Sequence, residues 1–154
     1  MYIRIPRSNV CEIFDDNYRF DFHKANIVKD GADVTVFTNG ETLAEALDAA
    51  NSLEKEGYSV QVVNVPVVKP IDEETILACA KKTKKVITVE NHSVIGGLGS
   101  AICEVLSEKY PVPVKRIGVK DQFGQSGNSD ILLDFYGLSA SKLEKSIKDF
   151  VSHK

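Results

Sequence analysis

The sequence has no surplus of positive charge, no long apolar run and few cysteines, and each absence excludes a class of protein. Its 154 residues carry a formal net charge of −3, which argues against the basic footprint of a nucleic-acid-binding domain. No apolar run approaches the ~20 residues that span a bilayer. The N-terminal stretch MYIRIPRSN lacks the apolar core of a signal peptide. We therefore expect a cytoplasmic protein that binds neither nucleic acid nor membrane.

Cysteine and histidine are too sparse to indicate a metal or disulfide framework. The cysteines are odd in number, far apart and form no CxxC pair: Cys11, Cys79 and Cys103. We interpret them as reduced structural thiols. The histidines have no second His or Cys at metal-ligand spacing: His23, His92 and His153. The sequence therefore gives no hint of a metal site.

Strand patterns alternate with helix patterns along most of the chain. Apolar residues make up 43% and charged residues 27% of the sequence, which fits one folded domain. Strands are predicted at 2–6, 25–29, 33–37, 59–65, 85–90 and 114–119. Helices are predicted between Thr38 and Gly57, from Asp72 through Cys79, over 97–109 and 131–137, and after Ser141. This alternation predicts a mostly parallel sheet with helices on both faces.

Three helix starts carry capping patterns. Thr38-Asn39-Gly40-Glu41 and Ser141-x-x-Glu144 both fit the capping box S/T-x-x-E. Asp72 directly precedes its predicted helix, where an aspartate side chain caps well. We expect all three patterns to mark helix N-termini.

The stretch VENHSVIGGLGSAI, residues 89–102, combines an acid, a histidine and three glycines where a strand leads into a helix. Gly96, Gly97 and Gly99 could let an anion dock at the helix N-terminus. The order GGLGSA fits neither GxGxxG nor a P-loop, so we favour a tight turn with close helix–sheet packing. Glu90 and His92 point to one face if the strand continues. They could act as base and orienter, but a polar strand end that faces a cleft or a neighbouring domain is the favoured alternative.

Two further segments carry candidate binding residues. The polar loop 120–127 follows the last strand, where binding residues often lie; a plain connection is an equal alternative. Arg4 and Arg7 flank the end of the first predicted strand. An arginine there suits a fork grip on phosphate or carboxylate, whereas the residue type alone favours a solvated surface position.

Five segments in order resemble the C-terminal part of transketolase. They are YIRIPRSN, DVTVFTNGETLAEALDAANSLEKEG, VVNVPVVKPID, VITVENHSVIGGLGSAI and FGQSGNSDILLDFYGLSASKL. Deoxyxylulose-phosphate synthase and the β subunits of 2-oxo-acid dehydrogenases share this domain, but the glycine and SG…LL…GL arrangements favour transketolase. The resemblance implies a three-layer α/β/α sandwich. Its five-stranded, mostly parallel sheet has an antiparallel first edge strand, supplied by residues 25–29.

The resemblance divides the chain into three parts and sets its function. Residues 1–10 resemble the end of a pyrimidine-binding domain, 11–24 a linker and 25–154 the transketolase C-terminal domain. The parent enzyme transfers a two-carbon ketol unit between sugar phosphates, with thiamine diphosphate and a divalent metal (Mg or Ca), in carbohydrate metabolism such as the pentose phosphate pathway. The cofactor carries the carbanion chemistry. The catalytic and cofactor-binding residues lie in other domains, so we expect this chain alone to be inactive and to serve domain packing and homodimer assembly.

One substrate-binding residue is implied within the chain. Arg7 matches the transketolase arginine that grips the substrate phosphate, with Arg4 as its neighbour. Glu90, His92, Gly96, Gly97 and Gly99 are candidates for an interdomain or ligand-facing surface. We expect Met1 to mark a cut or an internal start rather than a natural short subunit. Two alternatives stay open: a free-standing ligand-binding or regulatory module that uses the GGLG helix end, and a piece that completes a split enzyme by docking to a partner chain.

Overall fold

Five β-strands form one sheet in the part of the chain that the structure describes, residues 1–6 and 10–152 of the computed structural model. The strands are β1 (Asn26–Lys29), β2 (Val34–Thr38), β3 (Val60–Asn64), β4 (Val86–Ser93) and β5 (Val114–Val119). Their order is β1-β3-β2-β4-β5. β1 pairs antiparallel with β3, and the other neighbours are parallel. The predicted sheet and its antiparallel edge strand are confirmed.

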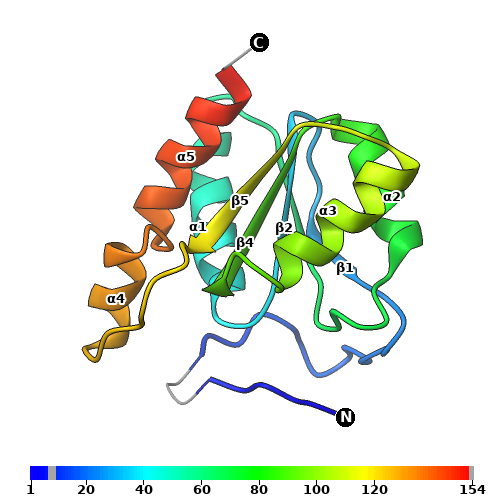
Figure 1. Cartoon of the computed structure of the whole chain (residues 1–154). Helices are drawn as coiled ribbons and strands as arrows, with labels where there is room; N and C mark the ends of the chain where they lie inside the picture. Colours follow the sequence, from blue (N-terminus) through cyan, green and yellow to red (C-terminus); the bar gives the residue numbers. More distant parts are fainter. Residues whose placement is uncertain (7–9, 153–154) are drawn as a thin grey trace.

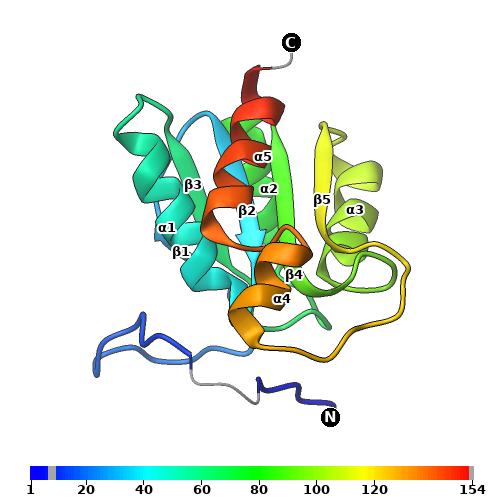
Figure 2. The same cartoon turned by 90° about the vertical axis from the view of Figure 1, so that its left-hand side faces the viewer.

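Helices cover both faces of this sheet and complete a three-layer sandwich (Figure 1). The helices α1 (Thr42–Glu54) and α5 (Ala140–Ser152) lie on one face, and α2 (Glu73–Thr83) and α3 (Leu98–Lys109) on the other. The short α4 (Ser129–Phe135) lies beside the start of α5 (Figure 2). Every residue of β2 and β3 is buried, as expected for parallel strands with both faces covered.

The core consists of two apolar clusters, one on each side of the sheet. On the first side, strand residues pack against Leu43, Ala46, Ala50 and Leu53 of α1 and Leu143 and Ile147 of α5. On the second side, they pack against Ile76 and Ala80 of α2 and Leu98, Ile102 and Leu106 of α3. Full burial of one Leu or Ile side chain stabilises a fold by about 1.5–3 kcal/mol, so these helix stripes hold the layers together.

Both predicted capping boxes are wrong, because the helices start elsewhere. Thr38 is the last residue of β2, and α1 begins at Thr42 with Glu41 as N-cap and no side-chain cap. Instead the Thr38 and Thr42 hydroxyls share a hydrogen bond of 2.8 Å. Ser141 lies inside α5, which begins at Ala140. The N–H group of Ala140 donates to the carboxylate of Glu45 from α1 at 2.6 Å.

The N-terminal segment, residues 1–6 and 10–24, contains no helix or strand. The predicted strand at 2–6 is therefore wrong, since a strand needs a pairing partner and these residues have none among the described residues. Tyr2, Ile3 and Ile5 are exposed. The segment passes along the lower side of the domain, at the carboxyl ends of the parallel strands (Figures 1 and 2). Arg7 lies outside the described residues.

Asp72 joins the end of this segment to α2. Its Oδ1 atom accepts from the N–H group of Thr75 at 3.2 Å, which confirms the predicted N-cap. Its Oδ2 atom accepts from the N–H group of Ala25, just before β1, at 2.9 Å. Burial raises the pKa of Asp72, but the hydrogen bonds from Thr75 and Ala25 outweigh burial and hold that pKa below its ordinary value. The ionised form of Asp72 therefore stabilises the fold.

We predict that Asp72→Asn destabilises the domain by about 1 kcal/mol near neutral pH, because a cap and a charge-assisted bond are weakened. The folded pKa is lowered, so this stabilisation is present above the ordinary Asp pKa and is lost as the pH falls through the lowered value. Urea unfolding of both proteins across that pH range measures the effect. The difference should vanish at the acidic end, and the exposed Asp48→Asn variant should show no such difference at either end. A constant difference would contradict the ionic origin.

Candidate functional site

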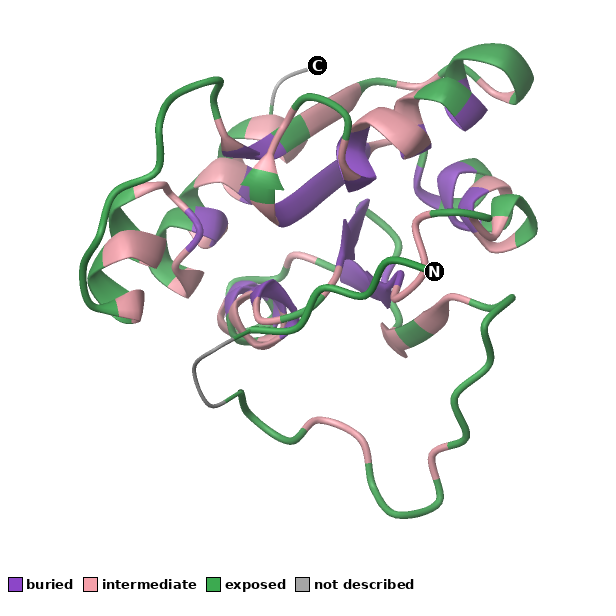
Figure 3. Cartoon of the chain, turned by 60° about the horizontal axis from the view of Figure 1, so that its bottom comes forward, coloured by how far each residue is buried: buried purple, intermediate pink, exposed green. Residues whose placement is uncertain are grey.

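The carboxyl ends of the parallel strands bring Glu90, His92 and the loop 120–127, which the sequence singled out, to one side of the molecule. In doubly wound α/β sheets this side carries the binding residues. Figure 3 views the domain from here and shows the described N-terminal segment, mostly exposed, on the near side of the buried strands. The end of β4 supplies Glu90 and His92, and Lys120 follows β5. We therefore describe the site from β4 outward.

Glu90 is a buried residue whose carboxylate caps the N-terminus of α3. Its side chain lies on β4 and the residue is 2% exposed. The N–H group of Leu98 donates to Oε2, and the N–H group of Gly99 donates to Oε1, both at 2.8 Å. A carboxylate at this position satisfies free N–H groups and interacts favourably with the helix dipole. The helix end that the sequence offered to an external anion is thus occupied by the chain's own carboxylate.

The glycines around this contact allow strand and helix to approach closely. A Cβ atom at Gly97 would lie 2.0 Å from Oε2 of Glu90, and one at Gly99 would lie 2.6 Å from Oγ1 of Thr88. Neither position has space for a side chain. Gly96 has a φ of +76°, which L side chains rarely adopt. The glycines serve close packing, the structural alternative that the sequence favoured.

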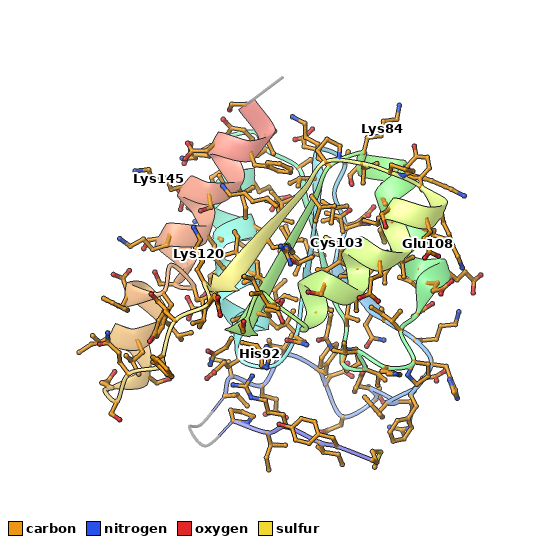
Figure 4. All side chains as sticks on the ribbon, viewed as in Figure 1. Lys84, His92, Cys103, Glu108, Lys120 and Lys145 are labelled. Atoms are coloured by element: carbon orange, nitrogen blue, oxygen red, sulfur yellow. The ribbon has the colours of Figure 1, made fainter. Side chains whose placement is uncertain are left out.

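His92 lies next to this cap but is half exposed, at the lower edge of the sheet (Figure 4). Its Nδ1 atom lies 2.9 Å from the carbonyl oxygen of Ser93 and 4.0 Å from Oε2 of Glu90. A ring nitrogen that faces a carbonyl carries the proton, so we assign the proton to Nδ1 and leave Nε2 as an acceptor. Both Glu90 oxygens accept backbone N–H groups, so the carboxylate acts as a helix cap rather than as a general base.

Two hollows flank the strand ends, and neither resembles a phosphate site. The first, of about 150 Å³, lies between the N-terminal segment, α1 and α4; its polar lining is acidic and includes Glu41, Glu45 and Asp130. The second lies between the end of β5, α4 and α5 and is lined by Lys120, Gln122, Asp134, Tyr136 and Lys142. The loop 120–127 therefore contributes two side chains to a hollow. In this hollow Asp134 already lies 3.9 Å from the Lys142 ammonium.

The cysteines do not supply an activated nucleophile. Burial raises the pKa of the Cys79 thiol to about 11 and raises the pKa of Cys103. Both thiols are therefore protonated near neutral pH, and the thiolate is the reactive form. Cys11 is exposed, in the N-terminal segment.

The described residues do not fit a diphosphate–metal group. Two of the free N–H groups at the start of α3, those of Leu98 and Gly99, already donate to Glu90. Within residues 1–6 and 10–152, no group of three or more His, Cys, Asp or Glu side chains could hold a metal ion. In the same ranges, no helix has the length and apolarity to cross a membrane.

Sequence reasoning missed Arg116 and Ser100, which hold the loop after β4. Arg116 Nη1 donates to the carbonyl oxygen of Val94 at 2.8 Å, and Ser100 Oγ donates to the same oxygen at 3.2 Å. Arg116 comes from the neighbouring strand β5, so the contact depends on the strand order. The available signal was the pair of charged residues, Lys115 and Arg116, within the otherwise apolar strand VKRIGV.

These features define an α/β/α domain in which a buried carboxylate of the chain itself, Glu90, caps the helix that follows β4. A family model described as "Transketolase, C-terminal domain" matches residues 23–143, and the chain belongs to this family. The relatives include the 6-deoxy-6-sulfo-D-fructose transketolase subunit SqwH of Clostridium sp. (strain MSTE9), 44% identical over 154 residues, which are 100% of this chain and 48% of the relative. The 1-deoxy-D-xylulose-5-phosphate synthase of Heliobacterium modesticaldum is 39% identical over 127 residues, 82% of this chain and 20% of that one.

A solved structure supports the same fold assignment. The structure of a split-gene transketolase in an inactive β4 tetramer superposes with a TM-score of 0.89 at 44% identity. The match covers 95% of this chain and 48% of that one. The chain thus spans about half the length of the curated transketolase relative and of the solved structure that it matches.

We predict that Glu90→Ala destabilises the domain by about 2–4 kcal/mol, because two buried N–H groups lose a charged partner. Glu90→Gln should also destabilise, since its amide turns a donor toward one of these N–H groups. Guanidinium unfolding followed by circular dichroism measures both changes. A loss below about 0.5 kcal/mol, the size of an ordinary surface change, would contradict the capping role.

Gly97→Ala supplies the matched test of the close approach. We expect it to destabilise the wild-type domain by about 1–3 kcal/mol, the usual range for overpacking. In the Glu90→Ala background it should cost much less, because the clashing carboxylate is gone. Gly124→Ala is the control, since a Cβ atom there meets nothing within 4 Å. Additive effects of Glu90→Ala and Gly97→Ala would contradict the contact.

Proposed function

We propose that this chain supplies the C-terminal domain of a thiamine-diphosphate-dependent transketolase, which transfers a two-carbon ketol unit from a ketose to an aldose. The observation that carries the proposal is the match to the transketolase C-terminal family over residues 23–143. The relative that the chain matches along its whole length is a transketolase subunit. The role of the domain is architectural: it packs against a pyrimidine-binding domain and contributes to a homodimer in the cytoplasm.

The cofactors, thiamine diphosphate with Mg or Ca, belong in this proposal to the parent enzyme. Thiamine diphosphate would supply the carbanion chemistry, between domains other than this one. The N-terminus of α3 supports that assignment, since Glu90 already satisfies the N–H groups that a diphosphate would use. The parent substrates are ketoses and aldoses with an anionic group, phosphate in pentose phosphate metabolism. The sulfonated sugar in the name of the Clostridium relative makes a sulfonate the second candidate.

Within the chain, we assign residues 1–10 to the end of the pyrimidine-binding domain, 11–24 to a linker and 25–154 to the C-terminal domain. Arg7 would bind the anionic group of the substrate. His92 would face the neighbouring domain, because it is half exposed at the edge of the sheet along which the N-terminal segment runs. Glu90, Gly96, Gly97 and Gly99 support that face from beneath.

A chimera tests the proposed activity. This chain replaces the matched region of the Clostridium subunit, and the hybrid is combined with the rest of that enzyme, thiamine diphosphate and Mg²⁺. We predict ketol transfer within about tenfold of the parent rate, since a change below about 1.4 kcal/mol in the barrier stays within that factor. The chain by itself is the control and should show none. A hybrid that folds and assembles but transfers no ketol unit would contradict the proposal.

Arg7 is tested in the same hybrid. We predict that Arg7→Ala raises KM for the anionic sugar about ten- to a hundredfold, which is the value of one lost charge-assisted hydrogen bond of about 1.5–3 kcal/mol. The value of kcat should change less, because the grip is remote from the reacting carbon. Arg7→Lys should recover part of the affinity. Arg19→Ala is the matched control, since the Arg19 guanidinium donates to backbone carbonyls of the linker. An unchanged KM would remove Arg7 from the site.

A further inference from the structure

The loop between β4 and α3 carries an exposed apolar side chain, Ile95. We call residues 94–97 the β4–α3 loop. Ile95 is 59% exposed, and it follows the half-exposed His92 at the carboxyl end of the sheet. One exposed isoleucine is ordinary on a protein surface. Whether Ile95 can serve as a binding contact depends on how firmly the backbone of this loop is fixed.

Hydrogen bonds fix the backbone on both sides of Ile95. The N–H group of Val94 donates to the carbonyl of Val119 at 3.0 Å. The N–H group of Ile95 donates to Ser93 Oγ at 3.2 Å, and that of Gly96 to Ser100 Oγ at 2.9 Å. Three successive N–H groups of this loop are therefore paired within the domain.

Two side chains, Arg116 and Ser100, fix the loop in addition to these hydrogen bonds. The Glu90 cap of α3 fixes the end of the loop. Both side chains donate to the carbonyl of Val94, at 2.8 and 3.2 Å. The N–H groups of the next residues, Leu98 and Gly99, donate to the Glu90 carboxylate. The backbone at Ile95 is thus fixed within the domain before a partner binds. A preorganised apolar contact loses little conformational entropy on binding, which is what an interface anchor requires.

The course of the chain indicates what covers this anchor. The family match begins at residue 23 and is to a C-terminal domain, so the remaining domains of the relatives join before this point. The described N-terminal segment, residues 1–6 and 10–24, runs along the same side of the molecule as the β4–α3 loop (Figures 1 and 2). Its apolar side chains Tyr2, Ile3 and Ile5 are exposed as well. A domain attached through this segment meets the loop.

We infer that Ile95 is the apolar anchor by which this domain docks onto the pyrimidine-binding domain, with Arg116 and Ser100 as its positioning residues. The partner surface is an apolar socket, and a donor at its rim reaches Nε2 of His92. The inference rests on the proposed function, because it takes the pyrimidine-binding domain as the occupant. It adds to that function the residue that makes the contact, Ile95, and the two side chains that fix its loop, Arg116 and Ser100.

Cysteine labelling of the hybrid subunit tests the anchor. Ile95→Cys is made in this chain alone and in the hybrid with the Clostridium N-terminal part. Its reaction with a maleimide is followed by peptide mass spectrometry, which separates the new thiol from Cys11 and Cys103. We expect labelling in the hybrid to be at least tenfold slower than in the chain alone. Lys145→Cys, on the exposed side of α5 (Figure 4), should react equally fast in both. An equal rate at position 95 would overturn the inference.

Two further measurements separate anchoring from a general loss of folding. If the hybrid does not fold, the same labelling is done with the N-terminal part added as a separate chain, with the same two outcomes. Arg116→Met combined with Ile95→Cys should restore at least a third of the unprotected rate, and Arg116→Lys should lower it again. Faster amide exchange at residues 94–96 in Arg116→Met is expected, while the midpoint of unfolding stays unchanged. Full protection of the thiol at position 95 in the Arg116→Met background would overturn the positioning role of Arg116.

Ketol transfer, measured beside the labelling, keeps the two proposals apart. Protection of the thiol at position 95 in a hybrid that transfers no ketol unit would support the anchor and contradict the proposed activity. Ketol transfer in a hybrid whose thiol at position 95 is unprotected would support the activity and overturn the anchor. The wild-type hybrid supplies the reference rate for ketol transfer.

Discussion

The contact between the Glu90 carboxylate and the N-terminus of α3 determines how the carboxyl end of the sheet is built. Its two oxygens each accept one backbone N–H group at 2.8 Å inside the protein. A buried carboxylate is costly unless it is fully bonded, so α3 must start at this point and at this height above β4. Gly97 has no side chain because the carboxylate occupies that space. The β4–α3 loop must then close within a few residues, which explains its positive φ at Gly96.

Other helices of the domain begin in the same way. Asp72 caps α2, and Glu45 of α1 accepts the N–H group of Ala140 at the start of α5. Helix N-termini are the usual docking points for phosphates in α/β proteins, and at α2, α3 and α5 internal carboxylates take these places. These helix dipoles therefore interact with carboxylates of the domain itself and stabilise its fold. This arrangement suits a domain that leaves phosphate binding to its neighbours, as the proposed function requires.

The sequence predicted what depends on local pattern and missed what depends on distant contacts. The strands 33–37 and 114–119, the α3 helix and the Asp72 cap follow from periodicity and neighbouring residues, and the structure agrees. The capping boxes at Thr38 and Ser141 were local matches that lost to other partners. α5 is capped by Glu45, 95 residues away in the chain, and no local motif encodes that. Glu90 was expected at a polar strand end that faces a cleft or a neighbouring domain, with a base as the alternative; its burial as a helix cap cannot be read from its residue type.

The strand predicted at 2–6 was wrong for a reason that bears on function. Alternating apolar residues favour a strand only where a second strand satisfies the backbone, and residues 2–6 pair with none of the strands in the described part of the chain. The same absence leaves Tyr2, Ile3 and Ile5 exposed. Under the proposed function, the strand that pairs with residues 2–6 would belong to the pyrimidine-binding domain. Because the N-terminal segment and the β4–α3 loop lie on one side of the molecule, the single domain of the proposed function would cover both.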